Sequence, residues 1–176
     1  MASAAGAADY RTIVAQHSRM CLDVQSASMA DNLPIIQARC NGSNSQMFDL
    51  RSVTGQTYLL ISRHSGKCLD VLNGQTQDNI PVNQYTCDGS PKQQFQVMGT
   101  QNQHNYNMVA VHSNKCVGIA NANPNVGTQL AQRQCDHSSA QTFQLIIAAA
   151  PAPALTPAPV AAPAQQAPFH RSAHTV

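Results

Sequence analysis

The chain has 176 residues, with ten Lys and Arg against eight acidic residues, all of which are Asp. A formal charge of +2 without charged runs argues against nucleic acid or an anionic membrane surface as a partner, and no apolar stretch is long enough for a membrane span. The absence of Glu and the abundance of Asn, Gln, Ser, Thr, Gly and Val disfavour helix, so one turn-rich, all-β domain is predicted.

Residues 1–9 form an extension before the first predicted strand. They lack the basic and apolar regions of a signal peptide. We nevertheless expect a secreted, extracellular protein, because six regularly spaced Cys in so short a chain indicate disulfides rather than cytosolic thiols.

Residues 10–147 repeat one motif three times, over about 10–56, 57–104 and 105–147. Each repeat begins with His-Ser-x-x-Cys, has a second Cys 19 residues after the first, and ends with Gln-x-Phe. The corresponding cysteines of successive repeats are separated by 47 and 48 residues. They are Cys21, Cys68 and Cys116 at the first place and Cys40, Cys87 and Cys135 at the second. This regularity indicates three copies of one structural unit.

Short apolar runs alternate with Gly, Asn, Asp and Ser turns, as in 12–15, 58–61 and 107–111. The pattern predicts roughly four short strands per repeat and about twelve in all. A unit of fewer than about fifty residues cannot bury a core alone, so a closed, pseudo-threefold body with a shared core is expected. One Phe and one Tyr from each repeat should lie in core strands: Phe48, Phe95 and Phe143, and Tyr10, Tyr58 and Tyr106.

A threefold unit with Cys-Leu-Asp-Val near its start and Gln-x-aromatic at its end resembles the ricin-type β-trefoil lectin family. The resemblance implies a β-trefoil that binds carbohydrate without catalysis. It also implies one disulfide within each repeat, joining Cys21 to Cys40, Cys68 to Cys87 and Cys116 to Cys135, whereas spacing alone permits fifteen pairings. The family usually ends its repeat with Gln-x-Trp, but this chain has Phe each time and no Trp.

In this family the sugar contacts come from the Asp of Cys-x-Asp, an aromatic residue two before the second Cys, and an amide two before that ring. The resemblance therefore places Asp70, Tyr85 and Asn83 in a carbohydrate site of the middle repeat. The carboxylate would accept from neighbouring hydroxyls, and the ring would pack under the C–H face of the sugar. Gln93 would brace the acid, and Lys92 stands where Asn is common, which changes one hydroxyl contact.

The outer repeats fit this pattern less well. The first keeps Asp23 and Gln46 but has Ala38 at the ring position, Ile36 at the amide position and Ser45 before its Gln. We expect it to bind sugar only weakly. The third is expected to be a structural copy without a site, since its residues at these places are Gly118, Ala131, Arg133 and Ala140. For the acids of the first two repeats, capping of a local turn is the alternative role.

No pattern argues for an enzyme, a metal or another cofactor. A glycosidase needs two carboxylates beside the scissile bond, and no clear second acid accompanies Asp70. The three repeated His residues, His17, His64 and His112, lie four residues before a Cys. A threefold arrangement would separate them, and oxidised cysteines cannot bind metal, so surface turns are expected instead.

Residues 148–176 form a tail rich in Pro and Ala, with six of the ten prolines in 148–168. Such a segment cannot bury enough surface to offset its ordering entropy, and we expect a semi-rigid linker. The predicted function is to target an attached catalytic or toxin domain, or a partner protein, to glycans such as galactosides or xylan-type polysaccharides. The alternatives are a protein-interaction or delivery subunit of a secreted toxin or enzyme complex, with degenerate sugar sites, and an inhibitor-like trefoil.

Overall fold

The computed structural model describes residues 9–102 and 104–147; most of the predicted N-terminal extension and the Pro/Ala-rich tail lie outside the described residues. Within these ranges the chain forms twelve strands and six 3-10 helices of three residues each, which confirms the all-β class. None of the helices in the described ranges combines the length and apolar character needed to cross a membrane.

The strands are β1 (Tyr10–Ala15), β2 (Cys21–Val24), β3 (Leu33–Ala38), β4 (Met47–Thr54), β5 (Thr57–Ser62), β6 (Cys68–Val71), β7 (Ile80–Tyr85), β8 (Gln94–Gly99), β9 (Tyr106–Ala110), β10 (Lys115–Ile119), β11 (Leu130–Arg133) and β12 (Phe143–Ile147). The 3-10 helices are η1 (Gln25–Ala27), η2 (Asn44–Gln46), η3 (Leu72–Gly74), η4 (Pro91–Gln93), η5 (Ala120–Ala122) and η6 (Ser139–Gln141).

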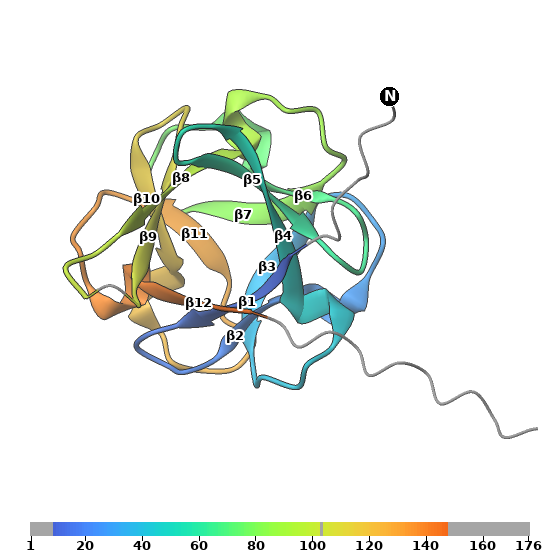
Figure 1. Ribbon diagram of the computed structural model, residues 1–176, viewed down its shortest axis with the longest axis horizontal. Coiled ribbons are helices and arrows are strands. Elements are labelled where there is room, and N and C mark those ends of the chain that lie inside the picture. Colours follow the sequence, from blue (N-terminus) through green and yellow to red (C-terminus); the bar gives the residue numbers. More distant parts are fainter. Residues whose placement is uncertain (1–8, 103, 148–176) are drawn as a thin grey trace, which may run out of the picture.

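Six of the strands close into an antiparallel barrel. Going round the barrel, β1 pairs with β4, β4 with β5, β5 with β8, β8 with β9, β9 with β12, and β12 with β1. The remaining strands form the hairpins β2–β3, β6–β7 and β10–β11, and β3, β7 and β11 meet one another around the same axis. Figure 1 shows the three similar lobes that result. Closure leaves no barrel strand with a free edge.

A disulfide joins the two cysteines of each repeat. The bonds are Cys21–Cys40, Cys68–Cys87 and Cys116–Cys135, the pairing that the family resemblance implies. Each closes a loop of 19 residues in sequence separation. In the chain-entropy model a loop of this size contributes about 3 kcal/mol to stability, so each hairpin is anchored within its own repeat.

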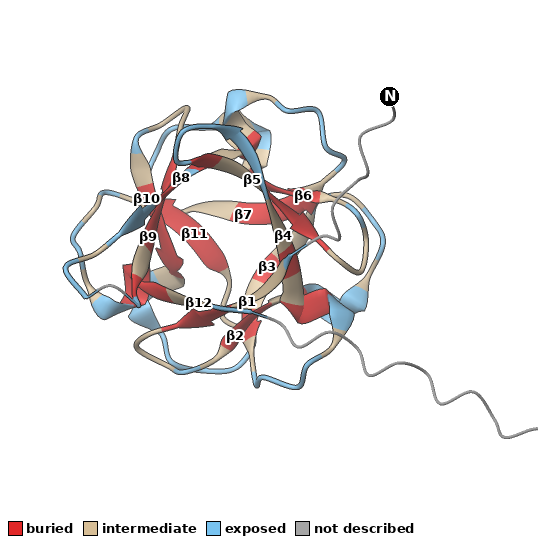
Figure 2. Cartoon of the chain, in the orientation of Figure 1, coloured by how far each residue is buried: buried red, intermediate tan, exposed pale blue. Residues whose placement is uncertain are grey.

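The core lies inside the barrel and beneath the three hairpins (Figure 2). The Phe that ends each repeat is at most 1% exposed, as the repeat pattern predicted: Phe48, Phe95 and Phe143. Leu22, Leu69 and Val117 enter the same core from the short strands β2, β6 and β10. Because side chains alternate along a strand, the next residue of each short strand, Asp23, Asp70 or Gly118, faces away from the core.

The prediction that a Tyr of every repeat lies in the core holds for Tyr58 and Tyr106 but is wrong for Tyr10, which stands one residue away from the equivalent position. Tyr58 and Tyr106 pair with the Phe of the neighbouring strand, but in the first repeat Arg11 takes this position. Both of these tyrosines pack against the core. A shift of one residue reverses the face of a side chain, and the ring of Tyr10 instead lies 4.8 Å from the guanidinium carbon of Arg63.

Three buried glutamines join neighbouring repeats. The side-chain amide of Gln84 donates to the carbonyl oxygens of Ser28 at 2.9 Å and Ala30 at 2.6 Å, and its oxygen accepts from the Ser65 hydroxyl at 2.7 Å. Gln37 and Gln132 make the equivalent three bonds in their repeats. A Gln three residues before the second Cys of every repeat is visible in the sequence, but we did not predict its role.

Candidate functional site

The predicted sugar site is built on the hairpin of β6 and β7. In its register Asp70 lies opposite Asn83, and Cys68 lies opposite Tyr85. Residues that face each other across an antiparallel pair, and residues two apart on one strand, share a face of the sheet. The acid, the amide and the ring therefore share the outer face of this hairpin, while the alternate side chains of β6 enter the core.

Asp70 is held by the end of its own repeat. It is only 3% exposed, and Gln93 Nε2 donates to Asp70 Oδ2 at 2.8 Å. The same amide group donates to the Thr86 carbonyl oxygen at 3.0 Å, and Gln93 Oε1 accepts from the backbone N–H groups of Asp88 and Gly89 at 2.8 and 3.2 Å. One buried, fully hydrogen-bonded Gln thus fixes both the carboxylate and the loop beside it.

Lys92 lies between the carboxylate and the ring. Its ammonium pairs with the carboxylate of Asp70 and lies 4.9 Å from the centre of the Tyr85 ring. The carboxylate of Asp88 is also 4.0 Å from this ammonium. The expectation that no clear second acid accompanies Asp70 therefore needs correction: two carboxylates face one ammonium, because the loop before η4 folds back over the hairpin.

Asn83 sits where the three repeats meet. Its Nδ2 donates to the carbonyl oxygen of Asn32 at 3.3 Å, and its Oδ1 accepts from Gln129 Nε2 at 3.1 Å. Asn32 belongs to the first repeat and Gln129 to the third. The residue is 6% exposed, so the amide that the resemblance assigned to a sugar contact is engaged with neighbouring repeats.

The first repeat keeps the acid but not the ring. Gln46 Nε2 donates to Asp23 Oδ2 at 2.8 Å, as in the middle repeat. Ser45, which stands where the middle repeat has its Lys, shares a hydrogen bond of 2.9 Å with the Ser43 hydroxyl. Ala38 occupies the place of the ring, and Asp23 is half-buried rather than buried.

The third repeat has neither the acid nor room for it. A Cβ at Gly118 would lie 2.8 Å from Cγ of Gln141 and 2.9 Å from the carbonyl oxygen of Ala140, both shorter than a normal contact. Gln141 still accepts from the Asp136 N–H at 2.9 Å and donates to the Gln134 carbonyl oxygen at 2.9 Å. The third repeat therefore keeps the Gln and its hydrogen bonds to the backbone, but it has no carboxylate that could accept from a sugar.

The repeated His-Ser pairs lie in turns. Their hydroxyls donate to the inter-repeat glutamines, which explains why Ser recurs there. A ring nitrogen of His112 lies 3.1 Å from the carbonyl oxygen of Gln75. Among residues 9–102 and 104–147, no three His, Cys, Asp or Glu side chains form a group suited to a metal ion.

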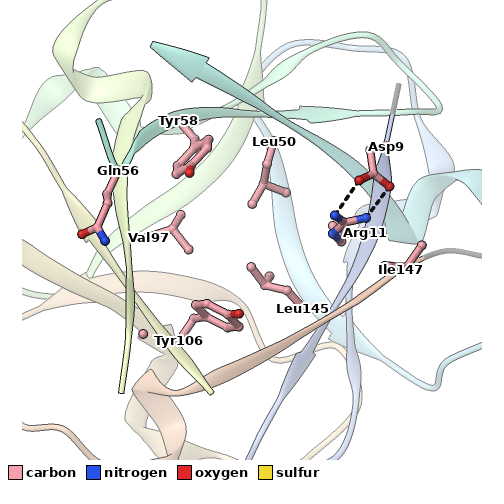
Figure 3. Close-up of a pocket in the computed structure, with 10 residues that line it drawn as sticks. Asp9, Arg11, Leu50, Gln56, Tyr58, Val97, Tyr106, Leu145 and Ile147 are labelled. Carbon is pink, nitrogen blue, oxygen red and sulfur yellow. Dashed lines mark hydrogen bonds and ion pairs between the residues drawn. The ribbon is translucent and has the colours of Figure 1, made fainter. Parts of the chain in front are cut away.

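A separate cavity of about 540 Å³ lies at the open end of the barrel. Figure 3 shows the rings of Tyr58 and Tyr106 and the side chain of Leu145 around it. On one side Arg11 Nη2 donates to Asp9 Oδ2 at 2.6 Å. None of the residues of the middle-repeat hairpin lines this cavity, so it is independent of the predicted sugar site.

Sequence reasoning placed Asp70, Tyr85, Lys92 and Gln93 in one site, and the structure brings all four together. It did not anticipate the ion pair between Lys92 and Asp70. A cationic residue directly before the bracing Gln was the available signal, and we interpreted it only as a changed hydroxyl contact.

Comparison with known proteins agrees with this architecture. A family model of the ricin-type β-trefoil lectin domain matches residues 9–143. The designed threefold-symmetric protein ThreeFoil is 34% identical, with a TM-score of 0.75 over 78% of this chain and 97% of its own. An exo-β-1,3-galactanase from Clostridium thermocellum is 24% identical, with a TM-score of 0.77 over 81% of this chain but only 31% of the galactanase chain. The agglutinin of Rhizoctonia solani is 16% identical, with a TM-score of 0.71 over 83% and 99% of the two chains. Among curated proteins, no sequence is significantly similar.

Proposed function

The chain belongs to the ricin-type β-trefoil lectin family, and from this premise we propose that it binds carbohydrate, without catalysis, through its middle repeat. One observation carries the proposal. A buried carboxylate, Asp70, and an aromatic ring, Tyr85, share one face of a disulfide-anchored hairpin, and Gln93 fixes the carboxylate.

This arrangement suits the two surfaces of a pyranose. Sugar hydroxyls donate to a carboxylate, and such charge-assisted bonds contribute about 1.5–3 kcal/mol each. The C–H face of the sugar packs on an aromatic ring. Because Asp70 is already ordered by Gln93, less side-chain entropy is lost on binding. With Asn83 engaged between repeats, the acid and the ring supply most of the recognition, which favours weak binding by a single site.

Three disulfides favour an oxidising compartment, so we place the protein outside the cell. There the module would target an attached or partner protein to glycans. The similar region occupies 31% of the galactanase chain, a precedent for this fold within a longer enzyme. Galactosides and xylan-type polysaccharides are the ligands that we propose to test first.

Titration of galactose, lactose and xylan oligomers, followed by calorimetry or NMR, tests the proposal. We expect Asp70→Ala to weaken binding by about tenfold or more, and Tyr85→Ala by a similar factor. Asp23→Ala, the same change in the first repeat, is the matched control and should have little effect. Thermal melts verify that the variants are folded. The proposal fails if the wild type binds none of these sugars, or if Asp70→Ala binds as tightly as the wild type.

A second candidate is a protein-interaction or delivery subunit. It is favoured by the absence of a ring in the first repeat and by the crowding around Gly118 in the third. Recovery of one defined partner in a pull-down, unaffected by competing sugar and by Asp70→Ala, would support this function over the first.

A further inference from the structure

We propose that Lys92 is an internal occupant of the middle-repeat site, which a saccharide must displace in order to bind. This inference rests on the proposed function and concerns the regulation of the same site. It starts from the position of the Lys92 ammonium, which pairs with the Asp70 carboxylate and lies 4.9 Å from the centre of the Tyr85 ring.

The Lys92 side chain is held along its length. Its stem runs past Gly74 in η3, where a Cβ would lie 3.5 Å from Lys92 Cδ and 3.8 Å from Lys92 Cβ. Both distances are those of ordinary van der Waals contact, so the stem lies beside η3, and the side chain of Lys92 is only 25% exposed. A surface lysine usually extends its ammonium into water, whereas this one turns its ammonium towards a buried carboxylate.

The Lys92 ammonium contacts both surfaces that a pyranose needs. Asp70 Oδ2 already accepts from Gln93 and Lys92, and Asp70 is 3% exposed, so the ammonium stands where a sugar hydroxyl would approach this oxygen. The ammonium also lies within about 6 Å of the Tyr85 ring centre, the range of a cation–π contact. When only a fraction of molecules has an open site, the apparent affinity falls by that fraction.

The displaced ammonium has a second partner nearby. The carboxylate of Asp88 is 4.0 Å from Lys92 Nζ in the closed arrangement. A short swing from Asp70 to Asp88 would open the site while the ammonium remains paired. The cost of opening is thereby limited, because the ammonium keeps an ionic partner and the buried carboxylate of Asp70 keeps its hydrogen bond from Gln93.

The first repeat supplies the natural comparison within the same chain. At the place of Lys92 it has Ser45, whose hydroxyl bonds to Ser43 and leaves the half-buried Asp23 with the Gln46 amide. The carboxylate of the middle repeat is therefore covered because Lys92 is present, and not because of the backbone that the two repeats share. Replacing Lys92 by Ser transfers the open arrangement of the first repeat to the middle one.

Two variants of the full chain test the inference with lactose and xylotetraose as probes. Lys92→Ser removes both the stem and the ammonium, whereas Lys92→Met keeps most of the stem and removes the charge. We expect the affinity to rise from wild type to Lys92→Met to Lys92→Ser, with the last about tenfold tighter than wild type. Lys115→Ser is the matched control: it removes an ammonium that pairs with Asp78 in the loop between β6 and β7, leaves the Asp70–Lys92 pair in place, and should bind as the wild type does.

The outcomes separate the inference from the function on which it rests. If Asp70→Ala loses binding but both Lys92 variants bind no more tightly than the wild type, the occupant role is wrong and the sugar site stands. If no folded variant binds either sugar, the proposed function itself fails. Weak binding by the wild type, together with tighter binding by both Lys92 variants, would support a closed site. Lys92→Met provides the same test if Lys92→Ser does not fold.

Discussion

The second and third repeats share a framework and differ in what the framework holds. In both repeats, a disulfide anchors the hairpin, and a buried Gln accepts a hydrogen bond from the backbone of the loop that follows the hairpin. Gln93 also binds the carboxylate of Asp70, whereas Gln141 packs where Gly118 leaves no carboxylate. The Gln is therefore part of the folding motif, and the acid is an addition to it. Absence of a binding site in one repeat need not weaken the fold.

The largest expected effect comes from removing this Gln from either repeat. Gln93→Leu and Gln141→Leu each remove several part-buried hydrogen bonds to the backbone of the neighbouring loop, and each should lower the free energy of unfolding by roughly 2–4 kcal/mol. Urea denaturation measures both. Sugar binding should be lost only in Gln93→Leu, because only Gln93 orients an acid. A much greater loss of stability in Gln93→Leu than in Gln141→Leu would show that the acid is a major part of the framework.

A carboxylate cannot simply be restored to the third repeat. In Gly118→Asp the new Cβ would lie 2.8 Å from a side-chain atom of Gln141 and 2.9 Å from a backbone oxygen, and overpacking of this kind costs about 1–3 kcal/mol. We expect lower stability and no additional sugar site. Gly99→Ala is the matched control: Gly99 is the last residue of β8, and nothing lies within 4 Å of its added Cβ. Equal stability of Gly118→Asp and Gly99→Ala in urea would contradict the packing argument.

The first repeat differs from the second by a ring, so adding one should improve its site. Ala38 and Tyr85 both lie opposite the first Cys of their repeats. In Ala38→Tyr, a sugar-facing ring contributes about 1 kcal/mol, which is roughly a fivefold gain in affinity at Asp23. Calorimetry should then detect a second binding site per chain. Arg133→Tyr places a ring at the same position of the third repeat, and should add no site because that repeat lacks the acid.

The regular spacing of recurring residues predicted the features that all three repeats share. Twelve strands, a buried Phe48 and its two counterparts all follow from residues that recur at fixed spacing. The features that could not be predicted from the sequence depend on contacts between repeats or between loops. Asn83 meets two other repeats, and Lys92 reaches Asp70 only after its loop folds back. The prediction for Tyr10 was wrong for another reason: a shift of one residue along a strand turns a side chain to the opposite face of the sheet.

The junctions between repeats also differ, and this gives the smallest expected effect. Lys67 pairs with Asp31 across the first junction, and Lys115 pairs with Asp78 across the second, each at 2.6 Å. At the third junction the residues at equal distances from the cysteines are Met20 and Val126, which are uncharged. Hydrogen bonding to the lysine ammonium lowers the pKa of Asp31 and of Asp78 in the folded protein.

A lowered folded pKa means that the unfolded chain takes up protons first as the pH falls. The two pairs therefore stabilise the fold above the ordinary Asp pKa of about 4, and this stabilisation is lost as the pH falls through the folded values. Asp31→Asn combined with Asp78→Asn should slightly lower the urea midpoint near pH 7, and the difference should shrink as the pH falls below the ordinary Asp pKa and through the lowered pKa values of the folded protein. Met20→Lys with Val126→Asp should add a third pair and a small gain with the same pH dependence. A difference that persists unchanged in acid would mean that the junctions depend on packing and on the buried glutamines, not on charge.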